Sequence, residues 1–194
     1  DALLEPWERE LADAAFQIAT IRQRVLDELR GPVIDKANAF LAELGDVSLI
    51  LSAGFGDRPT DSVENLMAAY AEARPLDRDR GHTRFGVHRA DWSLAFALAP
   101  RREHLSRGQE KLAALIMELA QVEHFRTRTQ EWPVLLLDDL ASELDREHQQ
   151  RVLDWMFEAG LQVWITGTEV PTSLQGRTEP WHLFHVEQGA ITPA

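Results

Sequence analysis

The chain has 194 residues, 44% hydrophobic and 27% charged, which suits one ordinary globular domain or two small pieces. No apolar run approaches the roughly 18 residues of a membrane helix, and no secretory signal is visible. The absence of cysteine excludes disulfide bonds and thiolate metal sites. A formal net charge of −12 argues against this chain being a main DNA-binding surface, because such surfaces neutralise phosphates with Lys and Arg.

The opening segment predicts two helices. Glu5-Pro6-Trp7-Glu8 puts a proline and acids in a first turn, where both favour a helix. Gly31-Pro32 is expected to break that helix, and a second one is expected from about Val33 to Leu44, where Gly45 stops it. Two helices without strands indicate an arm, residues 1–45, beside a core of residues 46–194. The first helix is amphipathic, with one apolar stripe at spacings of three and four: Leu11, Ala14, Ala15, Ile18, Ile21, Val25 and Leu29.

The middle of the chain predicts a strand, a helix and a second strand. Val47 to Leu51 alternates and predicts the first strand. Thr60 to Glu64 offers helix caps, and the helix is expected to end near Arg80-Gly81, with Pro75 able to kink it. Trp92 to Leu98, with apolar residues at alternate positions, predicts the second strand.

The last part predicts a strong helix, a strand–helix–strand unit and a hairpin, so the fold class is α/β. The apolar run in Pro133 to Asp139 favours a parallel strand covered on both faces. A helix from about Asp145 to Ala159 and a strand from Gln162 to Thr166 complete a βαβ unit. The strong helix has as its core face Leu112, Leu115, Ile116, Leu119 and Val122. The hairpin pairs Leu183–Glu187 with Ala190–Thr192 and turns at Gln188-Gly189.

A serine and a glycine mark the start of the strong helix, in Leu105-Ser106-Arg107-Gly108-Gln109. Helix N-termini have free N–H groups and the positive end of the helix dipole, so they bind phosphate. Gly108 would let an anion approach the backbone closely. The alternative is an ordinary serine cap with a glycine nearby.

Two carboxylates, Asp138 and Asp139, end the apolar strand. In nucleotide hydrolases a carboxylate at this place holds Mg²⁺. The residue after it can orient or deprotonate the attacking water. Ala141 to Asp145 follows at once, and it can equally be read as a helix start capped by Ser142 or Asp145.

Taken in order, these segments resemble the back half of an ABC-type ATPase, and specifically the RecF family. Leu105 to Gln109 has Arg in its third position, where ABC transporters have Gly. Gly86-Val87-His88-Arg89-Ala90-Asp91 resembles the family's Gly-Pro-His-Arg-x-Asp, with Val87 in place of Pro. Leu137 to Asp145 is similar to the Walker B motif and D-loop, and Gln162 to Thr168 to the strand that replaces the transporters' switch histidine. The likeness is close over residues 80–170 and looser in the opening helices and the final hairpin.

The phosphate-gripping loop of this class is missing. It requires Gly-x-x-x-x-Gly-Lys-Ser/Thr, whereas the only lysines, Lys36 and Lys111, follow Asp35 and Glu110. In RecF-like proteins that loop lies in the N-terminal half. Since the chain also starts at Asp1 within a helical pattern, we expect it to be a C-terminal fragment that does not hydrolyse ATP alone.

The resemblance implies the C-terminal lobe of a P-loop ATPase head with a helical arm. It implies that ATP and Mg²⁺ sit between two subunits, with Asp138 supporting the metal and Asp139 positioning water. The signature residues Ser106, Arg107, Gly108 and Gln109 would close over the other subunit's γ-phosphate. Ser142 and Asp145 would form the D-loop, and Thr166 and Thr168 the switch region.

The resemblance also implies partners. The full protein would dimerise on ATP, bind gapped or junction DNA, and help load recombinase with RecO and RecR in the cytoplasm, close to the nucleoid. These roles belong to DNA repair, recombination, replication restart and the SOS response. Transporters have Glu where this chain has Asp139, and the shorter side chain predicts slow hydrolysis.

Two alternatives remain open at this stage. One is another ATPase head, from a structural-maintenance or phage-defence relative. The other is a non-enzymatic interaction module of the same fold. Among other residues, His182 and His185 fall three apart on an expected strand, which disfavours a shared metal, and Arg126 and Arg128 are expected on a solvated loop rather than on DNA.

Overall fold

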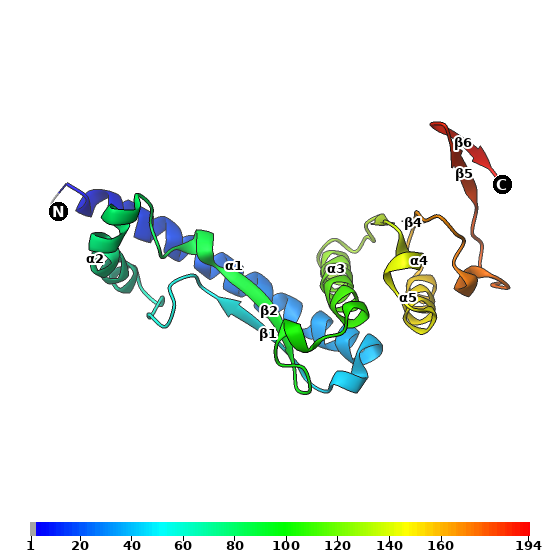
Figure 1. The fold of residues 1–194 in the computed structure, drawn as a ribbon, viewed down its shortest axis with the longest axis horizontal. Coiled ribbons are helices and arrows are strands. Elements are labelled where there is room, and N and C mark those ends of the chain that lie inside the picture. The colour runs from blue at the N-terminus through cyan, green and yellow to red at the C-terminus, as the bar shows by residue number, and fades with distance from the viewer. Residues whose placement is uncertain (1–2) are drawn as a thin grey trace.

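The computed structural model describes residues 3–194, apart from the side chains at positions 141 and 143. Figure 1 shows an elongated molecule in which one long helix, α1, runs from the N-terminal end towards the middle, with the final hairpin at the opposite end. The helices are α1 Glu5–Phe40, α2 Val63–Arg80, α3 Arg107–Thr129, α4 Leu140–Glu143 and α5 Arg146–Ala159. The strands are β1 Val47–Ser52, β2 Asp91–Phe96, β3 Leu135–Leu137, β4 Val163–Ile165, β5 Phe184–Glu187 and β6 Ala190–Pro193. Short 3-10 turns lie at Ala42–Leu44, Val87–Arg89, Arg102–His104 and Thr172–Leu174.

The strands form three two-stranded sheets in the described part of the chain. β1 and β2 are antiparallel, with Val47 opposite Phe96. β3 and β4 are parallel and are joined through α5, which confirms the predicted βαβ unit. β5 and β6 form the predicted hairpin, whose turn residues Gln188 and Gly189 both have positive φ, as a tight hairpin turn requires. The mixed helix and strand content confirms the α/β class.

Two separate apolar cores hold the molecule together. The main core joins the second half of α1 with β1, β2, α3, β3 and α5, so it draws on both sides of the boundary predicted at residue 45. That domain boundary stays a prediction. The second, distal core lies where α2 crosses the start of α1, and in it the rings of Phe55 and Tyr70 meet edge to face at 5.6 Å. Its buried members are Ala12, Ala15, Phe55, Leu66, Ala69 and Tyr70.

The predicted break at Gly31-Pro32 is wrong, because α1 continues through it for 36 residues. A proline inside a helix costs about 3 kcal/mol and a glycine about 1 kcal/mol. Burial outweighs this cost: Leu29 and Val33, on either side of the pair, are 5% and 0% exposed in the main core. Pro75 is likewise accommodated inside α2, which ends at Arg80 with Gly81 as its cap, as predicted.

The face that α1 buries differs from the predicted stripe. Ala15 and Leu29 are buried, together with Ala12 and Leu26, which the stripe did not include. Four of its apolar members are instead 39–52% exposed: Leu11, Ile18, Ile21 and Val25. Helix α1 therefore carries a buried face and, beside it, an exposed apolar one.

Strand β3 is covered on one face only, so the prediction of two covered faces is wrong for this structure. Leu135 and Leu137 are buried in the main core. Leu136 between them is 73% exposed, and Trp164, its partner across the parallel pair, is 52% exposed. The described residues supply a layer on one side of this small sheet and none on the other.

The predicted core face of α3 is confirmed in four of its five residues, since Val122 is only half buried. Arg126 and Arg128 lie in the last turn of α3 rather than on a loop, where Arg126 stacks over the Trp132 ring and Arg128 pairs with Glu28. Within residues 3–194, no helix is long and apolar enough to cross a membrane.

Candidate functional site

The carboxyl ends of β3 and β4 bring together the two acids and the threonine that the sequence singled out. Leu137 pairs with Ile165, and the Thr166 N–H donates to the Leu137 carbonyl at 2.9 Å. The hydroxyl of Thr166 donates to Oδ1 of Asp138 and accepts the backbone N–H of Asp139 at 3.2 Å. Thr166 therefore holds both aspartates in place from the neighbouring strand.

Asp139 has a strained backbone, with φ 50° and ψ 41° in the left-handed region. Asp tolerates this region better than most residues, yet it still costs on the order of 1 kcal/mol or more. The strain places the residue at the turn from β3 into α4, where its Oδ2 accepts the hydroxyl of Ser142. Strain of this kind at a strand end is common in sites that must aim a side chain.

One oxygen of Asp139 is buried without a hydrogen-bond partner among the described residues. This atom, Oδ1, would lie 3.8 Å from a Cβ placed on Gly167. Buried carboxylate oxygens are normally satisfied, so an unpaired one marks Asp139 as a candidate functional residue. Asp139 can thus accept a hydrogen bond from a molecule held beside β3 and β4.

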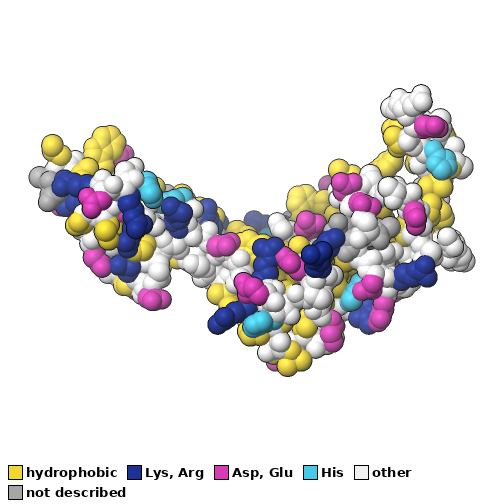
Figure 2. All heavy atoms as spheres, viewed as in Figure 1, with side chains coloured by type: hydrophobic (Ala, Val, Ile, Leu, Met, Phe, Trp, Pro, Cys, Tyr) yellow, Lys and Arg dark blue, Asp and Glu magenta, His cyan; other side chains and the backbone are white. Residues whose placement is uncertain are grey.

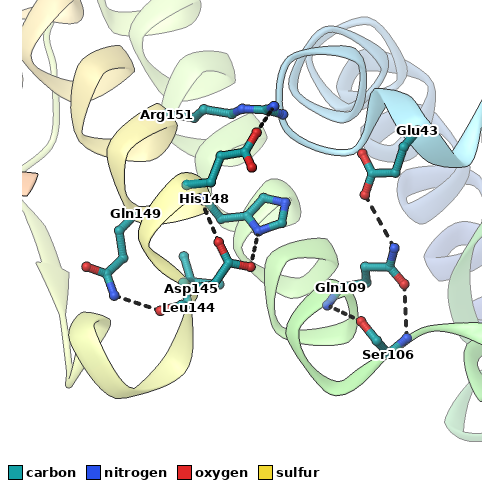
Figure 3. Close-up of polar contacts among 9 residues, drawn as sticks. Glu43, Ser106, Gln109, Leu144, Asp145, His148, Gln149 and Arg151 are labelled. Atoms are coloured by element: carbon teal, nitrogen blue, oxygen red, sulfur yellow. Dashed lines mark hydrogen bonds and ion pairs between the residues drawn. The ribbon is translucent and has the colours of Figure 1, made fainter.

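The start of α3 is a complete capping box. The Ser106 hydroxyl accepts the Gln109 backbone N–H at 3.2 Å, while the Gln109 side chain accepts the Ser106 N–H at 3.0 Å and donates to Glu43 at 3.3 Å (Figure 3). The ordinary capping interpretation of this serine is therefore correct. The N–H groups of Arg107 and Gly108 belong to the first turn and have no acceptor within the helix, so they remain available to an anion.

The start of α5 is also capped by the residues of the expected D-loop. Asp145 accepts the backbone N–H of His148 at 3.0 Å and contacts its ring at 2.6 Å, and these two bonds, the backbone one first, lower the pKa of the Asp145 carboxyl (Figure 3). The Gln149 amide donates to the Leu144 carbonyl at 2.6 Å inside the protein. Sequence reasoning missed His148 and Gln149, although Asp-x-x-His has the three-residue spacing of a cap.

Most of the predicted residues fall into two groups, with Asp145 and Thr168 outside both. Asp138, Asp139, Ser142 and Thr166 share one hydrogen-bonded cluster, whereas no hydrogen bond among the described residues links it to the capped start of α3. Thr168 is exposed in the bend that follows the cluster. Nor do three or more His, Asp or Glu side chains of the described residues gather as a metal site.

The Gly86 to Asp91 segment lies away from both groups and braces the distal core. The Gly86 N–H donates to the Gly54 carbonyl at 3.0 Å, and a Cβ on Gly54 would come within 2.2 Å of the Gly86 oxygen. Only glycine allows this approach of two backbones. Arg22 of α1 donates to the Val87 carbonyl at 2.5 Å and so ties the segment to the long helix.

A parallel strand pair that ends in two acids, an adjoining threonine and a separately presented helix N-terminus define the class: part of the ATPase head of the ABC family. Two solved structures carry the same fold. The chain matches the recombination mediator protein RecF bound to ATP with a TM-score of 0.78 and 27% identity, over 100% of this chain and 51% of that one. A second structure of RecF, in the RecFOR pathway like the first, matches with a TM-score of 0.75 and 26% identity, over 99% of this chain and 50% of that one.

The curated relatives name the particular family. DNA replication and repair protein RecF of Xanthomonas oryzae is 41% identical over 189 residues, which are 97% of this chain and 51% of the relative. The RecF of Stenotrophomonas maltophilia is 41% identical over 191 residues (97% and 50%), and that of Shewanella 34% over 190 residues (97% and 51%). No family model matches the chain. Over the region that it covers the chain is similar to these RecF proteins, and it spans about half the length of these relatives.

Proposed function

We propose that this chain is the signature and Walker B part of an ATP-dependent DNA-repair protein of the RecF type. The observation that carries the proposal is Asp139, whose strained backbone aims a buried carboxylate oxygen without a partner at the end of β3. The hydroxyl of Thr166 fixes this residue and Asp138 together. The relatives' name, DNA replication and repair protein, supplies the biological setting.

In this proposal each residue of the cluster has one task. Asp138 would support Mg²⁺ through Oδ2, the one carboxylate oxygen that Thr166 does not bind. Asp139 would position the attacking water through Oδ1, the oxygen that Ser142 does not hold. Mg²⁺, when bound, would neutralise charge on the phosphates. Thr168, beyond the cluster, is proposed for the switch region on the resemblance alone.

The cluster of Asp138, Asp139 and Thr166 suits a nucleotide whose phosphates are bound by another part of the protein. Lys36 cannot serve as a phosphate lysine, because its ammonium group is buried against Glu123 and the Trp155 ring. Lys111 lies inside α3 and follows Glu110 rather than glycine. The phosphate-gripping loop is therefore proposed for the further half that the relatives carry.

The two separate groups suit a site shared between two subunits. The first turn of α3, with Ser106 and Arg107 exposed, would close on the γ-phosphate of the other subunit's ATP. Ser142 and Asp145 are also exposed and would meet the dimer interface as the D-loop. Hydrolysis would then loosen the dimer, because the γ-phosphate bridges it. We also propose that the full protein binds DNA and works with RecO and RecR in the cytoplasm, near the nucleoid. The solved structure of RecF in the RecFOR pathway supports this setting.

The test is Asp139→Asn in a chain that carries both halves. ATP and Mg²⁺ should still bind, because Asp138 is untouched, whereas hydrolysis should fall by about 10²–10⁴-fold, the usual worth of a positioned base. The ATP-bound dimer, followed by light scattering, should live correspondingly longer. Asp13→Asn, an exposed change on α1, is the matched control and should leave both quantities unchanged.

Two outcomes would oppose the proposal. Wild-type turnover in Asp139→Asn would show that another group serves the water. Failure of the unsubstituted two-half protein to bind ATP would favour the non-enzymatic interaction module. Asp138→Asn separates the roles further, because it should weaken Mg²⁺-dependent nucleotide binding itself.

A further inference from the structure

The turn between α4 and α5 is held by a buried side-chain amide. Gln149 of α5 is only 5% exposed. Its Nε2 donates to the carbonyl of Leu144, five residues earlier, at 2.6 Å (Figure 3). Glutamine is seldom buried unless its amide is hydrogen-bonded, so this contact accounts for a polar side chain inside the protein.

Gln149 holds two successive carbonyls of the chain. While its side chain binds the Leu144 carbonyl, its backbone N–H donates to the Asp145 carbonyl at 2.9 Å. Because a peptide group is planar, fixing the Leu144 carbonyl also fixes the N–H of Asp145. The peptide groups on both sides of Asp145 are thus oriented by one residue, and Asp145 is held at φ −68° and ψ 167°.

Capping of α5 does not require the bond to Leu144. The cap is complete without it, because Asp145 accepts the His148 N–H and its own carbonyl begins the helical bonds. Leu144 lies one residue before this cap and directly follows α4. The Gln149 amide therefore fixes the path of the chain between the two helices. That path is the segment expected to form the D-loop, from Ser142 to Asp145.

The polar residues of this segment lie on the outside of the molecule. Leu144 is 7% exposed and anchors the turn in the main core, whereas Ser142 and Asp145 are exposed. Figure 2 shows charged side chains of both signs on the surface around α4 and α5. Obligate interfaces are more hydrophobic than transient ones, so this polar surface suits a contact that forms and dissolves.

We propose that Gln149 is a positioning residue of the D-loop, whose buried amide sets the backbone at Leu144 and Asp145 so that the segment fits the other subunit. The inference rests on the proposed function, in which Ser142 and Asp145 meet the dimer interface. Gln149 is itself buried, so it acts through the segment that it holds. Without the amide, the peptide group between Leu144 and Asp145 can rotate, and the exposed residues leave the orientation that the interface needs.

The experiment uses the full-length protein, that is, the chain together with the relatives' further half. Gln149→Met keeps the length of the side chain and suits a buried site, but it has no N–H to donate. Gln150→Met is the matched control, because it makes the same change one residue further along α5, where the side chain is exposed and its amide binds Asp154. ATP binding, turnover and thermal unfolding are measured for each variant, together with ATP-dependent dimerisation by light scattering.

Gln149→Met should bind ATP like the unsubstituted protein, because the amide lies outside the nucleotide cluster. Its ATP-dependent dimers should form about 10-fold more weakly, the usual effect of one lost bond to a buried acceptor. Turnover at a fixed protein concentration should fall with dimerisation, and Gln150→Met should match the unsubstituted protein throughout. Equal dimerisation in Gln149→Met and the control would overturn the inference, even with a lower Tm, because the amide would then serve stability alone.

Mixed dimers separate an effect on the other subunit from a local defect. Asp139→Asn protein, whose D-loop is intact, is mixed in excess with Gln149→Met before ATP is added. The intact D-loop then faces the ATP of the Gln149→Met subunit, so turnover per such subunit should rise by about 10-fold. Unchanged turnover would also overturn the inference, because Gln149 would then act only within its own subunit.

The remaining outcomes are assigned in advance. If Gln149→Met does not fold, Gln149→Asn replaces it, since the shorter amide leaves room for a water at the Leu144 carbonyl. Active Asp139→Asn protein would count against the catalytic assignment alone, because the dimerisation comparison still decides the role of Gln149. If the unsubstituted protein forms no dimers with ATP, the proposed function and this inference fail together.

Discussion

A buried lysine gives a sharp test of how the long helix is joined to the rest of the head. Lys36 of α1 has a side chain only 6% exposed, and its ammonium group pairs with Glu123 of α3 and sits 4.5 Å from the ring centre of Trp155 on α5. This cation of α1 thus contacts two other helices. Glu123, in contrast, is 35% exposed and can reach water.

This asymmetry predicts unequal costs for removing the two partners. Glu123→Leu leaves the ammonium buried without its anion, a change worth about 3–5 kcal/mol in fully buried pairs. The Trp155 ring still stabilises the cation by up to about 2 kcal/mol. We therefore expect the free energy of unfolding to fall by about 2–3 kcal/mol. Lys36→Met removes the buried charge while Glu123 hydrates, and should change stability by less than about 1 kcal/mol.

Thermal unfolding followed by circular dichroism measures both variants. At this chain length 1 kcal/mol corresponds to roughly 2–4 °C, so Glu123→Leu should lower Tm by about 5–10 °C and Lys36→Met by only a few degrees. The double variant should resemble Lys36→Met, because no buried charge remains. If Lys36→Met costs as much as Glu123→Leu, the reasoning from desolvation is refuted and the pair is held by packing alone.

Two further substitutions test local features of the fold. Asp145→Ala removes the cap of α5 and should cost about 0.5–2 kcal/mol in urea unfolding at neutral pH. Since the His148 bonds lower the pKa of Asp145, the wild-type advantage should be present above about pH 4 and vanish as the pH falls through the lowered pKa; an equal loss at pH 7 and pH 2 would contradict this. Gly31→Ala should stabilise α1 by about 0.5–1 kcal/mol, because a Cβ there meets nothing within 4 Å and the backbone is helical; a lower Tm would show that α1 needs flexibility at this point.

Much of the fold followed from local sequence signals. Ser62, Ser106 and Asp145 cap helices at their predicted starts, and Gly81 and Gly160 end helices in the left-handed conformation. These signals are readable because a cap satisfies backbone groups of its own turn. The short apolar runs before and after α5 likewise predicted the two strands, β3 and β4, that flank this helix.

The structural features that the sequence did not predict depend on contacts between distant segments. Burial of Val33 and Phe40 carries α1 through Gly31-Pro32, and no local rule contains that burial. The stripe containing Ile18 has the right period for a core face, but period alone does not say which partner covers it. The acids at the end of β3 were found by motif, whereas the left-handed backbone of Asp139 and its unpartnered oxygen emerged only from the structure.

Helix α1 is continuous, so a movement at one of its ends is transmitted to the other. Its 36 residues correspond to a rod of about 54 Å, whose one end lies in the distal core and whose other end lies among the helices of the main core. Had the helix ended at Gly31, a flexible joint would have separated the two. With a continuous rod, a tilt of about 10° at the Lys36 end swings the opposite tip by roughly 9 Å over that length. Small rearrangements near α3 and α5 are thereby converted into displacements as large as a helix diameter at the far end of the molecule.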